Sequence, residues 1–247
     1  MSHNFLKLND SKSEIILFGS PNFTQAFHSE LGTFAANVTQ SARNLGVFFD
    51  PDISFNTQVT KVVQSCYFQI RNIAKIKSFL SHADLETVIH AFISSRLDYC
   101  NSVYSGMSKK NISRLQMVQN SAARLLTNTR KREHITPILA TLHWLPVSFR
   151  IDFKILLITF KALHGLAPIY ITEMLVPYRP VRSLRSADRA LLVPPSTHRV
   201  TRGDRAFVAR APLLWNALPL ALRQAESVDS FKKLLKTHLY VSAFPDF

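Results

Sequence analysis

Residues 41–80 decide the organisation of this chain, and their sequence is SARNLGVFFDPDISFNTQVTKVVQSCYFQIRNIAKIKSFL. A short apolar strand is predicted over residues 45–49. A turn should follow at residues 50–52, because proline fixes φ and aspartate side chains accept local hydrogen bonds. The turn leads into a long helix, for which Asp52 or Ser54 is the predicted N-cap.

The long helix is amphipathic, because residues three or four apart share one face of an α-helix. Lys61, Arg71 and Lys75 fall on one side. Phe68 lies among them, where it could stack on a base or a sugar, although packing against the next helix is the favoured interpretation. A strand that delivers this helix at a fixed angle can hold the basic side over a groove. The opposite, apolar side consists of Phe55, Val59, Val62, Val63, Cys66, Ile70 and Ile73.

The chain is strongly basic, with a formal net charge of +14 at pH 7. Its 247 residues are 47% hydrophobic, so they can bury a core in one large domain or two small ones. Residues 1–54 hold three basic and five acidic side chains. Residues 55–130 hold ten basic and three acidic side chains, and residues 131–247 hold seventeen basic and eight acidic ones. A positive excess of this size indicates a polyanionic partner, either a nucleic acid or an acidic membrane surface.

Cysteine usage and hydropathy exclude several classes of protein. Cys66 and Cys100 are too few for a disulfide framework or a zinc site. Cys66 is predicted to be a buried free thiol, because it lies on the apolar helix face. The most apolar run, residues 155–160, is far shorter than the ~20 residues of a membrane span, and the N-terminus shows no signal-sequence pattern. These features predict an intracellular protein, cytoplasmic or nuclear, without a membrane span.

The order of predicted elements indicates an α+β fold that is predominantly α-helical. Residues 1–54 should form a small α/β piece. Residues 55–130 should form a bundle of three helices joined by short links. Residues 131–247 should form a mostly helical C-terminal module that includes a Pro/Arg-rich segment at 176–205.

Capping residues and helix breakers set the predicted helix boundaries. Ser81 and Asp84 resemble a capping box at the start of the second bundle helix, and the third bundle helix is predicted to begin near Ser108. A later helix should begin at Pro146 and end at Gly165. It is apolar around most of its circumference, which is typical of a buried helix. Its one narrow polar stripe consists of Arg150, Lys154 and Lys161.

Two pairs of short apolar runs are predicted to form β structure. Residues 35–38 should pair with residues 43–49 in the N-terminal piece. Residues 191–193 and 206–209 should form a hairpin in the C-terminal module, although the link between them is long for a tight turn.

Sequence motifs for catalysis are missing. The glycines are scattered singly rather than gathered in a phosphate-binding loop, and no G-x-S-x-G elbow occurs. His134 and His143 show no metal-ligand spacing, so both are interpreted as ordinary histidines. Asp50 and Asp52 are explained by the turn and the helix cap. No catalytic residue, no metal ligand and no cofactor is therefore predicted.

Several segments match a known family in order and spacing. LNDSKSEIILFG (8–19) and ARNLGVFFDPDISF (42–55) are followed by SSRLDYCN (94–101), RLQ (114–116), QN (119–120), LHWLP (142–146), RAL (189–191) and WNALP (215–219). The first two segments resemble the end of the palm of a LINE-type, non-LTR retrotransposon reverse transcriptase. The later segments are similar to the region downstream of that palm. The resemblance covers essentially the whole chain and implies a palm edge, a thumb and a C-terminal region.

The resemblance also implies what this chain lacks. The family polymerase binds two Mg²⁺ ions through an aspartate and an aromatic-Ala-Asp-Asp box, and neither motif occurs here. In the family, that box comes shortly upstream of the segment that matches residues 8–19. Met1 therefore matches an internal family position, and we expect a fragment that begins after the active site and does not polymerise on its own.

A few functional positions carry over from the family. Lys12 matches a lysine that assists the departing pyrophosphate. Leu45 and Gly46 match the primer grip, although an ordinary strand entry also explains them. Residues 55–130 resemble the thumb, whose helices contact the template–primer duplex. The predicted nucleic-acid-binding residues are Lys12, Leu45, Gly46, Lys61, Arg71, Lys75, Lys110, Arg124, Arg130, Lys131 and Arg132.

Three hypotheses about function follow. The first is a reverse transcriptase fragment that binds RNA or RNA–DNA duplex through its basic thumb-like face, largely without sequence preference. The second is a helical interaction protein whose C-terminal module binds a protein partner or an acidic surface. The third is a decayed copy with no selected role. Charge reversal at Lys61, Arg71 and Lys75 distinguishes the first hypothesis from the second.

Overall fold

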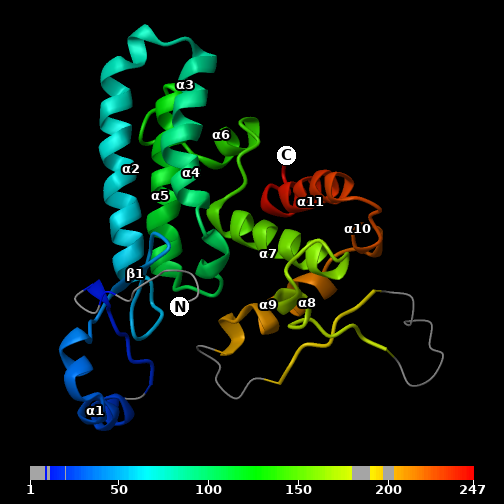
Figure 1. The fold of residues 1–247 in the computed structure, drawn as a ribbon. Helices are drawn as coiled ribbons and strands as arrows, with labels where there is room; N and C mark the ends of the chain where they lie inside the picture. The colour runs from blue at the N-terminus through cyan, green and yellow to red at the C-terminus, as the bar shows by residue number, and fades with distance from the viewer. Residues whose placement is uncertain (1–8, 10–11, 20, 180–189, 197–202) are drawn as a thin grey trace. The chain divides into compact units, whose positions relative to one another are not determined.

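The computed structural model describes residues 9, 12–19, 21–179, 190–196 and 203–247. Many helices and one short two-stranded sheet confirm the predicted α+β, predominantly helical fold (Figure 1). The chain divides into two compact units, residues 1–61 and 62–247. The second unit contains most of the predicted thumb segment together with the C-terminal module. Whether these two parts act as separate domains stays a prediction.

The first unit is small. It contains α1 (Pro21–Glu30), the 3₁₀-helix η3 (Gly32–Asn37), strands β1 (Ala42–Asn44) and β2 (Val47–Phe49), and the first turns of α2 (Asn56–Ile76).

The predicted pairing of residues 35–38 with residues 43–49 is wrong. Residues 43–49 instead fold back on themselves, so that β1 and β2 pair antiparallel with Ala42 opposite Phe49. Val38 forms an isolated parallel bridge with Ile15. The physical reason is the short turn between β1 and β2, because closing a two-residue loop costs less chain entropy than a longer one.

A cap centred on Asp50 leads into α2. The Asp50 carboxylate accepts the backbone N–H of Ser54 at 2.7 Å and that of Phe55 at 2.8 Å. Ser54 Oγ in turn accepts the N–H of Asn56 at 3.3 Å. The helix therefore begins at Asn56, later than a cap at Asp52 or Ser54 predicts. Asp50 satisfies the backbone donors that the chain exposes before the first helical turn.

The second unit consists mainly of helices. They are the rest of α2, η4 (Lys77–Phe79), α3 (His82–Ile89), the π-helical turn η5 (His90–Ser94), α4 (Ser95–Asp98), η6 (Asn101–Tyr104), α5 (Lys109–Thr127), α6 (Thr136–Thr141), α7 (Val147–Leu163), α8 (Ile169–Thr172), η8 (Gly203–Arg205), α9 (Phe207–Asn216), α10 (Leu220–Arg223) and α11 (Val228–Ala243).

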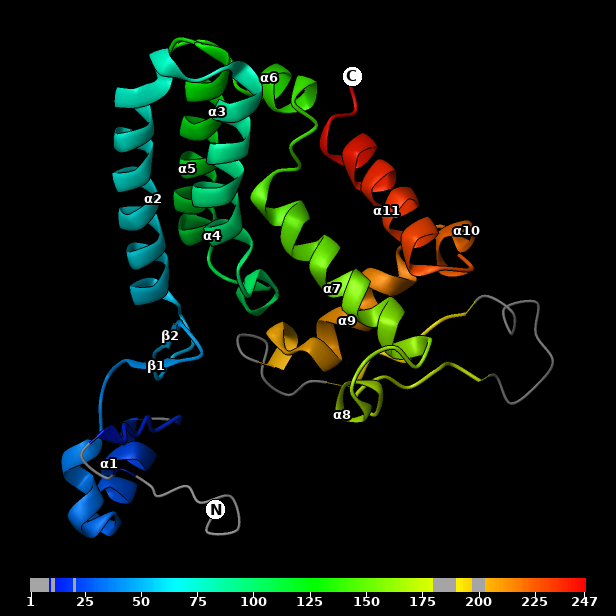
Figure 2. The same cartoon turned by 45° about the horizontal axis from the view of Figure 1, so that its top comes forward.

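The predicted capping box at Ser81 and the predicted helix start near Ser108 are confirmed. Ser81 Oγ accepts the N–H of Asp84 at 3.2 Å, and Ser108 Oγ accepts the N–H of Asn111 at 3.3 Å. The helices α2, α3 with α4, and α5 lie side by side (Figures 1 and 2). The sequence pattern did not predict the π-helical turn η5, which widens the second bundle helix at His90.

The predicted helix from Pro146 to Gly165 is also confirmed, as α7. Gly165 has a φ of +67°. Its N–H donates to Ala162 O, and the N–H of Leu166 donates to Lys161 O. This pair of bonds is a Schellman motif, which ends a helix through a left-handed residue. The helix packs against α9 and α11 on one part of its circumference and against α4 and α5 on another.

The predicted hairpin between residues 191–193 and 206–209 is wrong. Leu192 forms an antiparallel bridge with Pro177, and residues 207–209 begin α9. A four-residue apolar run cannot be assigned to a strand or a helix from its period alone. The apolar pattern continues at helical spacing to the buried Trp215, and this longer pattern indicates a helix.

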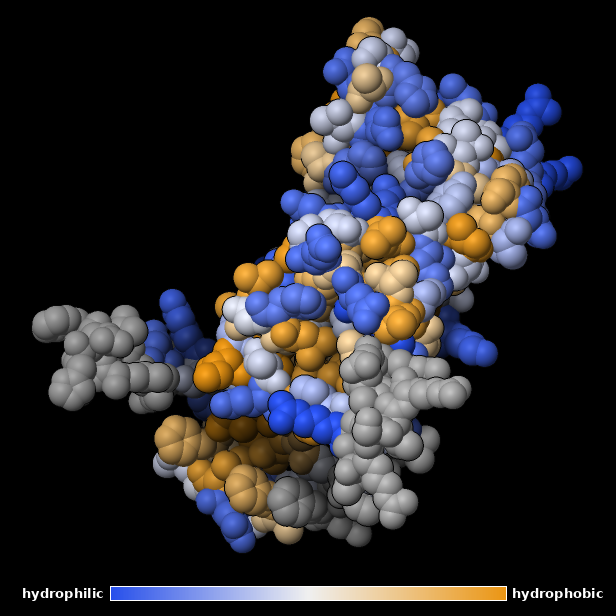
Figure 3. Space-filling view, turned by 90° about the vertical axis from the view of Figure 1, so that its right-hand side faces the viewer, coloured by the Kyte–Doolittle hydropathy of each residue, from blue (hydrophilic) through white to orange (hydrophobic). Residues whose placement is uncertain are grey.

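No helix in the described part of the chain combines the length and hydrophobicity of a bilayer crossing. In the upper part of the face that Figure 3 shows, apolar groups are interspersed among hydrophilic ones, which is normal on protein surfaces. In the lower part of the same view, apolar groups gather around a hollow.

The buried thiol of Cys66 leads to a first testable prediction. Cys66 is a free cysteine with 0% exposure, as predicted, whereas Cys100 is a half-buried free cysteine. Burial raises the pKa of the Cys66 thiol to about 11, although Arg96 nearby opposes part of the shift. The thiolate is the reactive form. At pH 8, a thiol reagent should therefore label Cys100 in the folded protein and label Cys66 only after denaturation.

A Cys100→Ser variant provides the control, because it should show almost no labelling until denaturant is added. Labelling followed by mass spectrometry reports both sites. Equal labelling rates for the two cysteines in the folded protein would contradict the buried position of Cys66.

Candidate nucleic-acid interface

One side of α2 forms an exposed basic face, which we call the α2 face. Lys61, Gln64, Phe68, Arg71 and Lys75 are all exposed on it. Within the described part of the chain, its lysines and arginine form no ion pair with a carboxylate. Their charges therefore remain available for a polyanion such as a phosphate backbone.

The structure corrects the preferred interpretation of Phe68, which is 54% exposed and not packed in the bundle core. The buried side of α2 carries Cys66 and Ile73, with exposures of 0% and 2%. A residue two positions after Cys66 is turned by roughly 200° on the helix and so points away from that side. An exposed aromatic ring among cations can stack on a base or a sugar.

Contacts with α5 fix the rotation of α2. The hydroxyl of Tyr67 lies 3.4 Å from Ser121 Oγ. At the end of the bundle, Lys77 Nζ donates to Leu125 O and to the side chain of Asn128. Lys77 thus satisfies carbonyl and amide acceptors at the C-terminus of α5, where a cation is favourable. These contacts on the inner side keep the α2 face outward.

The loop after α5 adds basic residues near the same end of the bundle. Arg130, Lys131 and Arg132 are exposed. Arg124 is half-buried, and its guanidinium donates to Arg130 O at 3.3 Å and to Glu133 O at 2.8 Å. This geometry gives Arg124 the role of positioning the loop.

Lys110 is exposed but lies at the other end of α5. It is 14 residues before Arg124, which corresponds to about 21 Å along a helix. In the second unit, the structure therefore brings Arg71, Lys75 and the 130–132 loop toward one end of the bundle and leaves Lys110 apart.

The predicted residues of the first unit include a tight turn. Leu45 and Gly46 connect β1 to β2, with φ values of +46° and +83°. Two successive positive φ angles in a two-residue hairpin are typical of a type I′ turn. The side chain of Gln58, which is 4% exposed, accepts the N–H of Phe48 at 3.0 Å. The first turns of α2 thus hold the hairpin, while Leu45 is 83% exposed at its tip.

Lys12 lies on a segment next to this hairpin. Its side chain is exposed. Two residues further on, Glu14 Oε2 accepts the N–H of Arg43 in β1 at 3.4 Å. Within the first unit, the structure therefore places the segment that carries Lys12 beside the strand that precedes Leu45 and Gly46.

The turn gives a second prediction. A leucine in the left-handed region is strained by its Cβ, whereas asparagine tolerates that region. Leu45→Asn should therefore raise the free energy of unfolding by about 1 kcal/mol. Leu45→Val is the matched control, and it should lower the stability because a β-branched residue fits a positive φ poorly. Urea unfolding followed by circular dichroism measures both. A stability loss in the asparagine variant would contradict the left-handed turn.

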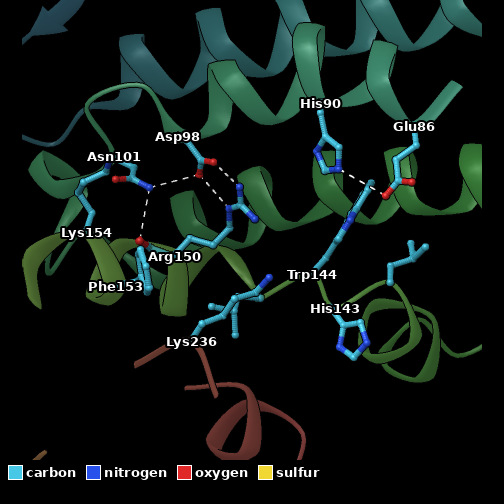
Figure 4. Close-up of a pocket in the computed structure, with 12 residues that line it drawn as sticks. Glu86, His90, Asp98, Asn101, His143, Trp144, Arg150, Phe153, Lys154 and Lys236 are labelled. Carbon is cyan, nitrogen blue, oxygen red and sulfur yellow. Dashed lines mark hydrogen bonds and ion pairs between the residues drawn. The ribbon is translucent and has the colours of Figure 1, made fainter. Parts of the chain in front are cut away.

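The second unit contains a cavity of about 420 Å³ that the sequence pattern did not predict (Figure 4). Its lining includes Asp98, Trp144, Arg150, Lys154 and Lys236. A partial signal was present in the sequence, because Arg150 and Lys154 belong to the narrow polar stripe of an otherwise apolar helix. The other lining residues, on α4 and α11, could not be found from periodicity.

The RAL (189–191) and WNALP (215–219) segments meet in the structure. Trp215 Nε1 donates to Ala190 O at 2.7 Å. The side-chain amide of Asn216 accepts the N–H of Leu192 at 2.9 Å and donates to its carbonyl at 2.8 Å. These contacts fix the segment around residue 191 against the end of α9. Arg189, which begins the RAL motif, lies outside the described residues.

No cluster of three or more His, Cys, Asp or Glu side chains in the described ranges is arranged to hold a metal ion. His134 and His143 are both exposed, and the ring of His143 lies 5.3 Å from that of Tyr240. The chain matches no protein-family model, and searches of the curated proteins and of the solved structures found no match.

Proposed function

We propose that this chain is part of a non-LTR retrotransposon reverse transcriptase and that it binds RNA or RNA–DNA duplex through the α2 face. Binding would depend on phosphate contacts and would have little sequence preference. The part with the family's catalytic aspartates has no match in this chain, so the chain is expected to add no nucleotides to a primer by itself.

The observation that carries this proposal is the set of exposed cations on the α2 face, which have no carboxylate partner in the part of the chain that the structure describes, together with the exposed ring of Phe68. Cations spaced along one side of a helix can follow a phosphate backbone, and the ring between them can contact a sugar or a base. The basic loop at residues 130–132 extends the positive charge near the end of the helix.

A filter-binding experiment tests the proposal. Duplex RNA and an RNA–DNA hybrid should both be retained at low salt, with similar affinities across unrelated sequences. Retention should fall steeply as salt rises, because binding releases counterions from the phosphates. Failure to retain either duplex at low salt would contradict the proposed function.

The second candidate function is binding of a protein partner by the C-terminal module. A specific observation favours it: Leu166, Ile169, Tyr170 and Val176, around α8, are all exposed. Grouped apolar side chains on a surface are typical of interaction sites. Charge reversal on the α2 face should leave such an interaction intact, whereas it should abolish the retention of nucleic acid.

A further inference from the structure

The cavity in Figure 4 is formed by segments that are far apart in the sequence. Its walls come from α3 to η6, from the turn before α7, from α7 itself and from α11. Its volume of about 420 Å³ lies within the usual range of small-molecule sites. The cavity lies wholly in the second unit and includes no residue of the α2 face.

The walls of the cavity are held in place by polar contacts. Arg150 Nε donates to Asp98 Oδ1 at 2.8 Å, and Arg150 Nη2 donates to Asp98 Oδ2. The buried side chain of Gln119 donates to Leu145 O at 2.9 Å, which ties the turn before α7 to α5. A site whose side chains are fixed before binding loses little entropy when a ligand arrives.

The turn that carries Trp144 is itself a Schellman motif. His143 has a φ of +52°. Its N–H donates to Ala140 O, and the N–H of Trp144 donates to Leu139 O. This motif ends α6 and directs Trp144 to the inside of the unit. Trp144 as a whole residue is 6% exposed. The LHWLP segment therefore builds one wall of the cavity.

The charges that line the cavity favour an anion. Asp98 is neutralised by Arg150. Glu86 also lines the cavity, and its carboxylate lies 3.6 Å from His90 Nε2, a contact that is an ion pair only when His90 is protonated. Lys154 and Lys236 line the same cavity and form no ion pair with a carboxylate of the described residues. With His90 neutral, the two lysines and Glu86 together still leave a positive excess in the lining. Figure 4 shows Lys236 entering from α11, on the side opposite Asp98 and His90. Two ammonium groups at one cavity that have no carboxylate partner among the described residues suit a phosphate group.

Rings line another part of the cavity. The His90 and Trp144 rings have centroids 5.2 Å apart. Phe153 also belongs to the lining, but it lies apart from this pair, on the side of Asn101 (Figure 4). His90 is the first residue of the π-helical turn η5, and such turns are frequent at functional sites. Aromatic walls offer flat surfaces on which a base can pack.

From the two lysines and the aromatic rings that line the cavity, we infer that it is a binding site for a nucleoside phosphate. Lys154 and Lys236 contact the phosphate, and the base packs against the His90–Trp144 pair. The phosphate-bearing nucleotide is either free in solution or the 5′ end of a strand. This site is separate from the α2 face, so it is a second point of contact with nucleotides.

Calorimetric titration with adenosine monophosphate tests the inference. The test variant is Lys154→Gln/Lys236→Gln. The matched control is Lys161→Gln/Lys233→Gln, which removes the same charges from α7 and α11 at positions outside the cavity lining. The folded protein should bind adenosine monophosphate saturably. The test variant should bind at least tenfold more weakly, and the control should stay within twofold of the parent.

Further ligands decide the source of the phosphate. A 5′-phosphorylated trinucleotide that binds more tightly than adenosine monophosphate assigns the site to a strand end, whereas equal or weaker binding assigns it to a free nucleotide. The inference would be overturned if adenosine, which has no phosphate, bound with the same affinity as adenosine monophosphate. The absence of saturable binding, or an equal loss in both double variants, would also overturn it. A variant of the α2 face should keep this binding, so failure of one site is distinguishable from failure of the other.

Discussion

Replacing Lys61, Arg71 and Lys75 together by glutamate is expected to weaken the binding of duplex RNA by about a hundredfold or more. These side chains are exposed on the α2 face and have no carboxylate partner among the described residues. If the α2 face binds duplex RNA as proposed, each substitution removes one phosphate contact and adds a repulsive charge. Filter binding at low salt, with parent and variant compared, measures the loss.

A control must distinguish the effect of a lower net charge on RNA binding from the effect of charge reversal on the α2 face itself. Glutamate at Lys161, Lys232 and Lys233 changes the net charge by the same amount on α7 and α11. This control should lose much less affinity, because those helices lie away from the α2 face. Equal losses in the two triple variants would mean that only net charge matters, and would contradict a defined interface. Because the substituted α2 residues are exposed, circular dichroism should show no loss of helix.

Trp215→Ala is expected to lower the free energy of unfolding by about 3–5 kcal/mol. Trp215 is 1% exposed, and its ring centroid lies 5.9 Å from that of Phe231 and 6.5 Å from that of Phe160. These rings join α7, α9 and α11. The substitution leaves a cavity between the helices and removes the donor to Ala190 O. Since typical domains are stable by about 5–15 kcal/mol, this loss is a large part of the total.

Urea unfolding followed by the fluorescence of the remaining Trp144 measures this effect. Leu213→Ala on the same helix is the matched control. Leu213 is exposed, so its loss should change stability by less than about 0.5 kcal/mol. Trp215→Phe should fall between the two, because it keeps an aromatic ring but loses the indole N–H. A Trp215→Ala variant as stable as the parent would contradict the described core.

The helices could be predicted because their signals are local. Ser81 and Ser108 cap their own helices, and Gly165 ends α7 through its own left-handed conformation. The apolar side of α2 is likewise a property of spacing along one helix. The basic face could therefore be predicted residue by residue, including the exposure of Lys61 and Arg71.

Features that depend on contacts between distant segments could not be predicted in this way. Asp98 and Arg150 are separated by 52 positions, and no periodic pattern relates them. Non-glycine residues with positive φ are equally hard to foresee. Leu45 and His143 each adopt one, where a pattern of glycines would have been the usual signal.

The salt dependence of duplex RNA binding tests the central claim most directly. Its measure is the slope of the logarithm of the association constant against the logarithm of the salt concentration. Each phosphate contact contributes about 0.9 to this slope on B-form DNA. Glutamine at Lys61, Arg71 and Lys75 should therefore make the slope shallower by about 2 to 3, whereas glutamine at Lys161, Lys232 and Lys233 should leave it unchanged. An unchanged slope in the α2 variant would contradict the claim that this face binds the nucleic-acid backbone.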